Sequence, residues 1–169
     1  MTMLPRDWGL AAAAGALTLD QVSKLTLLYG FGFKDFAPGE AVPVLPFFNL
    51  VMVWNPGVSY GLFPAHSRLG SSVLVFLSLL AVCGLGWWLW NAHRRSLTVG
   101  LGLVIGGAIG NNLIDRLIYG KVADFFHFYG LGYDWYVFNV ADAAITFGVI
   151  ALLYDALMTP APRPGPESR

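Results

Sequence analysis

Four long apolar stretches limit the fold of this chain more than any other feature. They cover residues 8–29, 71–90, 97–118 and 137–157, and a helix that crosses a bilayer needs about 20 mostly apolar residues. Only 12% of the chain is charged and 56% is hydrophobic, whereas about 25% charge is usual for a globular domain. The sequence therefore predicts an all-α membrane protein with four transmembrane helices.

The segments between and after these stretches have distinct compositions. Residues 30–70 combine prolines with β-forming residues such as Phe47 and Val51, which predicts a small extracytoplasmic β-rich element between helices 1 and 2. Residues 119–136 are expected to be an aromatic loop at the membrane–water interface. The proline-rich tail, 159–169, is predicted to be disordered. Residues 1–158 then form a single membrane-embedded domain.

The distribution of basic residues predicts the orientation. Four spans put both termini on one side, together with the turn that carries Arg94 and Arg95. Because basic residues favour the cytoplasmic side, we expect both termini in the cytoplasm and residues 30–70 and 119–136 outside. The first stretch is interpreted as a retained helix rather than a cleaved signal peptide, since no clear small-residue cleavage site follows it.

Charge and cysteine content exclude several classes of protein. Ten basic residues balance ten acidic ones, so the chain has no basic field that would attract nucleic acid. A single cysteine, Cys83, excludes an intramolecular disulfide and a cysteine-based zinc cluster. The sequence contains no P-loop, no His-Glu-x-x-His pair and no Gly-x-Ser-x-Gly turn.

Ionisable residues inside spanning segments are costly, and they are usually paired or functional. Asp20 and Lys24 are four residues apart in the first stretch and can form an ion pair on one helix face. In the third stretch, Gly102, Gly106 and Gly110 recur every four residues, which is typical of close helix packing.

A polar cluster ends the third stretch. Asn112, Asp115 and Arg116 are expected to share one helix face. The cluster is either an interfacial cap or a group that binds a peptide backbone.

Asp124 and Asp142 are the candidate catalytic residues. Read singly, Asp124 is a loop acid, and Asp142 is an acid that stabilises the start of the fourth helix. Asn139 lies three residues before Asp142 and points the same way. Both acids belong to the same side of the membrane, where two close carboxyl groups would share a proton and act as acid and base on one water. That is the chemistry of an aspartic protease.

Four ordered motifs resemble the lipoprotein signal peptidase (signal peptidase II) family. The resemblance extends from about residue 8 to 157. The motifs are Leu19-Asp20-Gln21-Val22-Ser23-Lys24; Asn55-Pro56-Gly57-Val58-Ser59-Tyr60-Gly61; Gly106-Gly107-Ala108 through Asn112, Asp115 and Arg116 to Val122-Ala123-Asp124-Phe125; and Phe138-Asn139-Val140-Ala141-Asp142.

The resemblance implies a membrane aspartic endopeptidase that cuts diacylglyceryl-modified prolipoproteins just before the lipidated cysteine. The catalytic pair falls on Asp124 and Asp142. The substrate-binding positions fall on Asn55, Gly57, Asn112, Arg116 and Asn139, and the supporting ones on Asp20, Lys24 and Asp115. We expect a monomer in the bacterial inner membrane that contacts membrane lipid, has its active site towards the outer face, and needs no metal or cofactor.

The sequence departs from the family pattern at two places. Tyr60 stands where phenylalanine is usual, and the stretch from Gly110 to Asp115 is one residue longer than the commonest form. This insertion leaves open whether Asn111 or Asn112 fills the family position.

Two other functions fit parts of the pattern. A small channel or transporter would use the charged residues of the helices as a polar path, yet residues 71–90 contain no ionisable side chain that would line it. A metal-dependent intramembrane protease would need ligands near His66, His93 or His127, and none of these histidines belongs to a helical ligand motif.

Overall fold

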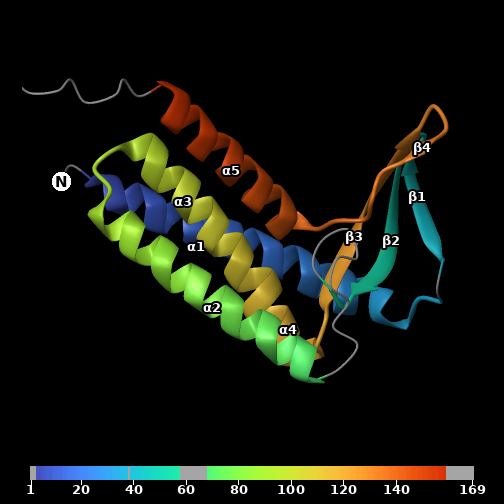
Figure 1. The fold of residues 1–169 in the computed structure, drawn as a ribbon. Helices are drawn as coiled ribbons and strands as arrows, with labels where there is room; N and C mark the ends of the chain where they lie inside the picture. Colours follow the sequence, from blue (N-terminus) through green and yellow to red (C-terminus); the bar gives the residue numbers. More distant parts are fainter. Residues whose placement is uncertain (1–2, 38, 58–67, 159–169) are drawn as a thin grey trace, which may run out of the picture.

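Long helices run beside one another, and a small sheet stands at one end of them (Figure 1). The computed structural model describes residues 3–37, 39–57 and 68–158. The α-helices are α1 (Pro5–Leu25), α2 (Arg68–Asn91), α3 (Arg95–Ala108), α4 (Arg116–Tyr119) and α5 (Val140–Met158). Two π-helical segments, η1 (Thr26–Gly30) and η4 (Ile109–Asp115), extend α1 and join α3 to α4, and a short 3₁₀ turn, η2, covers Phe33–Asp35.

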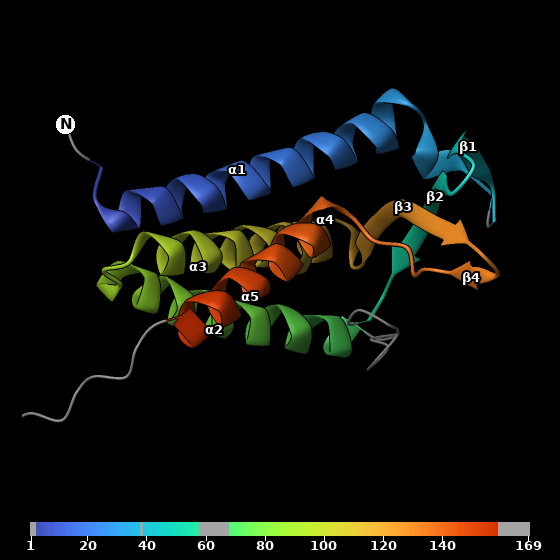
Figure 2. The ribbon, with the colours of Figure 1, turned by 90° about the horizontal axis from the view of Figure 1, so that it is seen from above.

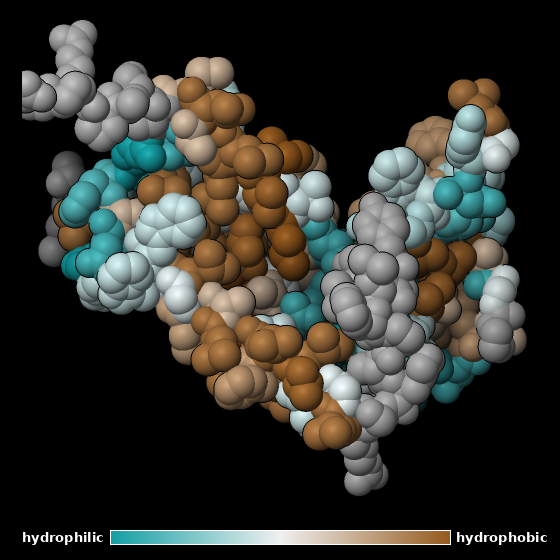
Figure 3. All heavy atoms as spheres, viewed as in Figure 1, coloured by the Kyte–Doolittle hydropathy of each residue, from teal (hydrophilic) through white to brown (hydrophobic). Residues whose placement is uncertain are grey.

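Within the described residues, three helices are long and apolar enough to cross a membrane. They are Leu69–Asn91, Arg95–Tyr119 and Val140–Met158, in agreement with the second, third and fourth predicted spans. The helix α1 has 21 residues but includes Arg6, Asp7, Asp20 and Lys24. Its passage through the membrane remains a prediction. Hydrophobic residues cover much of the helical surface in Figure 3.

Glycines hold α3 tightly against the helices on either side of it. A Cβ atom added to Gly102 would overlap the carbonyl oxygen of Gly9, and one added to Gly106 would overlap that of Ala13. The predicted small-residue stripe is therefore the face of α3 that packs on α1. On the α5 side, a Cβ at Gly107 would lie 2.6 Å from the carbonyl oxygen of Ala141. Figure 2 shows α3 running alongside α1.

The sheet is antiparallel, with the strand order β1-β2-β3-β4. Its strands are β1 (Ala41–Leu45), β2 (Phe48–Asn55), β3 (Val122–Gly130) and β4 (Tyr133–Asp134). The segment between helices 1 and 2 does form strands, as predicted. It supplies only half of the sheet, however.

The aromatic segment 119–136 is not a loop as predicted, because most of it forms β3 and β4. Its β-forming residues pair with β2, with Trp54 opposite Ala123 and Phe48 opposite Phe128. The rings of Phe48 and Phe128 lie 4.7 Å apart across the strands. Such cross-strand pairs stabilise a sheet that neither segment would form alone. The pairing also places Asp124 on a strand.

A small hydrophobic cluster joins the end of α1 to the sheet. Leu28, Phe33, Ala123 and Phe125 are buried together, and the rings of Phe33 and Phe125 meet edge to face at 6.1 Å. This cluster fixes the start of β3, and with it Asp124, against the end of the helical bundle.

Some sequence predictions fall outside the described residues. They concern Tyr60, His66, the second half of the Asn55–Gly61 motif and the tail 159–169, and they remain predictions.

Candidate functional site

Asp124 is the buried acid of the site. It lies in β3 opposite Val53 of β2, and only 2% of its surface is exposed. Its Oδ1 accepts a 2.6 Å hydrogen bond from the side-chain amide of Asn139, and its Oδ2 accepts one of 3.2 Å from Asn55.

The pKa of Asp124 is raised to about 7. Burial is the main cause, and the neighbouring charge of Asp142 adds to it, while the hydrogen bonds from Asn55 and Asn139 act in the opposite direction. Near neutral pH this carboxyl group is therefore present in both its protonated and its ionised form.

Asp142 lies in the first turn of α5, where Asn139 caps the helix. The backbone N–H of Asp142 donates to Oδ1 of Asn139 at 3.0 Å, and the backbone N–H of Asn139 donates to Oδ2 of Asp142 at 3.2 Å. This reciprocal cap agrees with the predicted i, i+3 relationship of the two residues. Asn139 is hydrogen-bonded to both acids, so it holds them in one site.

The tertiary structure brings the two acids together through the connection between β3 and α5. The backbone of Phe138 pairs with that of Phe126, so the chain returns along β3 just before α5 begins. The predicted catalytic pair thus lies in one polar site, where the negative charge of Asp142 influences the ionisation of Asp124.

The predicted substrate-binding residues lie beside Asp142. Nη1 of Arg116 donates to the carbonyl of Pro56 at 3.1 Å, Nη2 donates to the carbonyl of Gly57, and Nε donates to Oδ1 of Asn112 at 3.3 Å. Oδ1 of Asn55 accepts the backbone N–H of Gly57 at 3.0 Å. Arg116 therefore fixes the turn from which Asn55 reaches Asp124.

A pocket of about 200 Å³ opens among these residues. Its lining consists of Asn55, Gly57, Asn111, Asn112, Arg116, Val122, Asp142 and Ile145. Amide, guanidinium and carboxylate groups thus surround a space next to Asp142, and Asp124 is joined to this lining by its hydrogen bond from Asn55. In Figure 3 the surface is hollowed between the helices and the sheet.

The supporting residues form a buried ion cluster beneath the site. Nζ of Lys24 lies 2.8 Å from Oδ2 of Asp20 and 2.8 Å from Oδ2 of Asp115, and all three side chains are at most 2% exposed. The ion pair predicted between Asp20 and Lys24 is confirmed. Oδ1 of Asp20 also accepts the backbone N–H of Ala141 at 2.9 Å, which ties the cluster to the start of α5.

The prediction that Asn112, Asp115 and Arg116 share one face is wrong. Asp115 faces Lys24 on α1, whereas Arg116 and Asn112 face the turn at Gly57. The reason is the π-helical segment η4, whose wider turn changes the angular spacing of its side chains.

Two residues of the site were absent from the predicted set. The amide of Asn111 contacts both Lys24 and Asp142, and Nε2 of Gln21 donates to Asp20 and to Asp115 at 3.0 and 3.3 Å. The sequence signal for Asn111 was the additional residue before Asp115. That signal left two adjacent asparagines as candidates, and the structure gives them different contacts.

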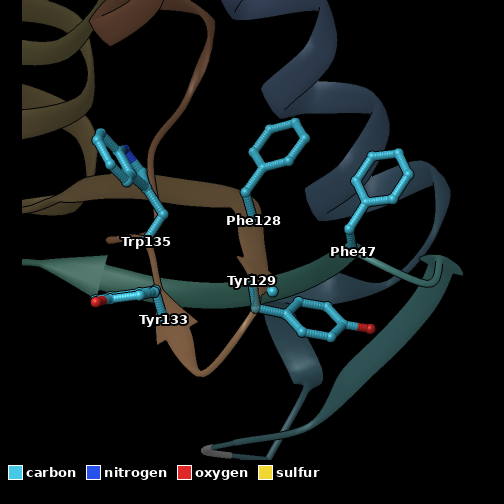
Figure 4. A pocket seen from close by; sticks show the side chains of 6 residues that line it. Phe47, Phe128, Tyr129, Tyr133 and Trp135 are labelled. Carbon is cyan, nitrogen blue, oxygen red and sulfur yellow. The ribbon is translucent and has the colours of Figure 1, made fainter.

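A second pocket lies on the sheet and has a different character. It measures about 250 Å³ and is lined by Phe47, Phe128, Tyr129, Gly130, Tyr133 and Trp135 (Figure 4). The side chains of this pocket carry no carboxylate, amide or guanidinium group. Four aromatic residues of the segment 119–136 thus line a pocket that contains neither Asp124 nor Asp142.

Comparison with known proteins identifies the family. The family model described as "Signal peptidase (SPase) II" matches residues 12–158. The chain is 51% identical over 164 residues to a lipoprotein signal peptidase of Nitrobacter hamburgensis, covering 94% of this chain and 98% of that protein. It is 46% identical to a lipoprotein signal peptidase of Beijerinckia indica, with 98% of each chain covered.

The fold agrees with solved structures. One bacterial membrane enzyme, determined by the in meso method at 2.3 Å resolution, superposes with a TM-score of 0.76 at 26% identity, over 88% of this chain and 87% of that one. A second, determined at 1.9 Å resolution, gives a TM-score of 0.74 over 90% of this chain and 94% of that one. With a family match over most of its length, this chain belongs to the signal peptidase II family.

Proposed function

We propose that this protein removes the signal peptide from lipid-modified prolipoproteins, cutting before the diacylglyceryl cysteine, with Asp124 and Asp142 as the catalytic pair. The family match supports an aspartic endopeptidase that acts on lipoprotein precursors. The assignment of these two residues rests on one observation: Asn139 is hydrogen-bonded to both carboxyl groups.

The pair performs acid–base chemistry on one water molecule. One carboxylate takes a proton from the water, which attacks the carbonyl carbon of the scissile peptide bond, and the other carboxyl group donates its proton towards the substrate. A pKa of about 7 suits Asp124 to carry that proton at neutral pH. Asp142, which lines the pocket, faces the space where water and peptide would meet.

Arg116 and the asparagines bind the peptide backbone around the scissile bond. A peptide that leaves its helical conformation within the membrane exposes N–H and carbonyl groups, each costly to leave unpaired in an apolar setting. Amides both donate and accept, and a guanidinium donates a planar fork. Asn55, Asn112, Arg116 and the backbone at Gly57 supply these groups around the pocket.

The site faces the outer side of the bacterial inner membrane. In Figure 1, α1 begins and α5 ends at the end of the bundle away from the sheet. The turn between α2 and α3, with Arg94 and Arg95, lies at that same end. Basic residues favour the cytoplasm, so the termini are cytoplasmic and the sheet with both acids is extracytoplasmic. The proposal includes a monomer surrounded by lipid.

Purified protein and a defined substrate test this function. A prolipoprotein carrying the diacylglyceryl cysteine should be cleaved before that cysteine, and the same precursor without the lipid should be cleaved poorly or not at all. Cleavage should be insensitive to chelators, because carboxyl groups activate the water. If a chelator inhibited cleavage and added zinc restored it, the aspartic mechanism would be contradicted. If the lipidated precursor stayed intact, the function itself would be contradicted.

A further inference from the structure

Asn111 makes two polar contacts that join the buried ion cluster to the catalytic pair. Its Oδ1 accepts a 2.6 Å hydrogen bond from Nζ of Lys24, and its Nδ2 donates a 2.9 Å hydrogen bond to Oδ1 of Asp142. Its side chain is nearly buried, with 5% of the residue exposed. We propose that Asn111 is a positioning residue for Asp142 and that Lys24 fixes the orientation of its amide. The proposal rests on the proposed catalytic role of Asp142.

The chemistry of the two neighbours allows only one orientation of this amide. An ammonium group has donors and no acceptor, so the atom that faces Lys24 must be the amide oxygen. The amide nitrogen then faces Asp142, whose ionised carboxylate can only accept. A flipped amide would place donor against donor and acceptor against acceptor. Lys24 therefore ensures that Asp142 receives an N–H.

Lys24 is itself held in place by charges on two helices. Asp20 of α1 and Asp115 at the end of η4 each lie 2.8 Å from its Nζ. With Asn111, these residues give the ammonium three acceptors for its three N–H groups. A fully satisfied buried cation keeps a single geometry, because any movement would leave charged groups unpaired in a low-dielectric environment.

The contact from Asn111 completes the hydrogen bonding of Asp142. Its Oδ2 already accepts the backbone N–H of Asn139 at 3.2 Å, and Asn111 supplies the donor for Oδ1. With both oxygens held, the carboxylate has a fixed plane and distance relative to Asp124. A catalytic group must be held within fractions of an ångström of its working geometry.

The π-helical segment η4 gives Asn111 and Asn112 different tasks although they are adjacent. Asn111 reaches across to α1 and α5, whereas Asn112 accepts a hydrogen bond from Arg116 on the side of the pocket. The wider turn of a π-helix adds one residue to a helix without ending it. One asparagine can therefore orient an acid while its neighbour contributes to the substrate-binding side.

The test is made at Asn111 rather than at Lys24. Removing Lys24 would leave Asp20 and Asp115 buried without a cation, which typically unfolds or strongly destabilises a protein. Asn111→Asp keeps the size of the side chain and an acceptor for Lys24, but it presents an oxygen instead of an N–H to Asp142. The matched control for loss of an asparagine is Asn91→Ala at the end of α2, where the exposed amide donates to the carbonyl of Trp87.

Steady-state cleavage of lipidated precursor should show a split between the two kinetic constants. A hydrogen bond to a charged group contributes about 1.5–3 kcal/mol, so Asn111→Asp and Asn111→Ala should lower kcat about 10- to 100-fold. KM should stay within about twofold, because the amide oxygen of Asn111 is already bonded to Lys24 and its nitrogen to Asp142. Asn91→Ala should behave as wild type. Wild-type kcat in folded Asn111→Asp would overturn the proposal.

Two further measurements keep the test decisive. If Asn111→Asp does not fold, the comparison is made between Asn111→Ser and Asn111→Ala. The serine hydroxyl can still donate a hydrogen bond, so Asn111→Ser should retain the higher kcat per folded molecule. Equal values of kcat would overturn the proposal. Infrared difference spectra against Asp142→Asn identify the carboxylate band of Asp142, which Asn111→Ala should shift. An unshifted band would overturn the proposal even without turnover. Absence of cleavage by wild-type protein would instead contradict the proposed function.

Discussion

The side-chain amide of Asn139 lies 2.6 Å from Oδ1 of Asp124. The backbone N–H of Asn139 also donates a hydrogen bond to Oδ2 of Asp142. One residue thus joins an acid on a strand to an acid on a helix. Because Asn139 is also the cap of α5, the start of that helix and the spacing of the proposed catalytic pair are set by the same contacts.

Removing either carboxyl group should abolish cleavage. Asp124→Asn and Asp142→Asn should each lower the rate by at least about 10³-fold, because an amide neither takes nor gives the proton and acid–base catalysis is typically worth 10²–10⁴-fold. Turnover of lipidated precursor by purified protein measures this. The control is Asp134→Asn, since that side chain is 81% exposed on β4. Near-normal turnover by either site variant would remove that residue from the mechanism.

The cleavage rate should fall as the pH rises above about 7. Burial raises the pKa of Asp124 to about 7, so above that pH the group loses the proton that it donates, and kcat/KM should fall about tenfold per pH unit. Asn55→Ala removes a hydrogen bond that favours the ionised form and should therefore move the decline to higher pH. The pH profile of Asn49→Ala, on the same strand, should match wild type. A decline that stays at the same pH in Asn55→Ala would contradict the assignment to Asp124.

Arg116 should be needed for cleavage through the geometry of its hydrogen bonds and not only through its charge. Arg116→Ala should lower kcat/KM at least about 100-fold, because the turn at Gly57 and Asn112 loses the donors that fix it. Arg116→Lys should recover only part of the rate, since an ammonium lacks the planar fork. Arg95→Ala, at the opposite end of the bundle, serves as the control. A folded Arg116→Ala that cleaves at the wild-type rate would exclude this role.

The contact between α1 and α3 should tolerate no side chain at Gly102. Gly102→Ala places a methyl group against the carbonyl of Gly9 and should destabilise the protein by about 1–3 kcal/mol, as overpacking does. Thermal unfolding in detergent measures the loss. Gly86→Ala on α2 meets nothing within 4 Å and should be neutral or slightly stabilising, because alanine favours a helix. Equal melting temperatures for the two variants would contradict this packing.

Topology reporters should place the two ends of the bundle on opposite sides of the membrane. Fusions after Arg94 and at the C-terminus should report the cytoplasm, and an insertion at Gly39, which lies between η2 and β1, should report the outside. The physical reason is the retention of Arg94 and Arg95 on the cytoplasmic side. An external signal after Arg94 would put both acids on the cytoplasmic side, away from exported substrates.

The sequence alone was sufficient for features that depend on local spacing or composition. Hydropathy predicted the second, third and fourth helices because a spanning segment must be apolar along its whole length. The spacing of Asp20 and Lys24 predicted their ion pair, and the spacing of Asn139 and Asp142 predicted their shared orientation, since both lie within one or two helical turns. The order of the motifs was enough to predict the family, which the comparisons confirm.

Only the tertiary structure decided how distant segments meet. β3 forms because β2, more than 60 residues earlier in the chain, offers an edge to pair with, and no local pattern in 119–136 encodes that partner. The π-helical turn at η4 rotates Asp115 towards Lys24, away from the face that a regular helix would share with Asn112 and Arg116. In the same segment Asn111 contacts Asp142. Side-chain direction across such a turn depends on the helices packed around it. The sequence therefore determined which polar groups are available for the proposed chemistry, and packing determined which of them touch.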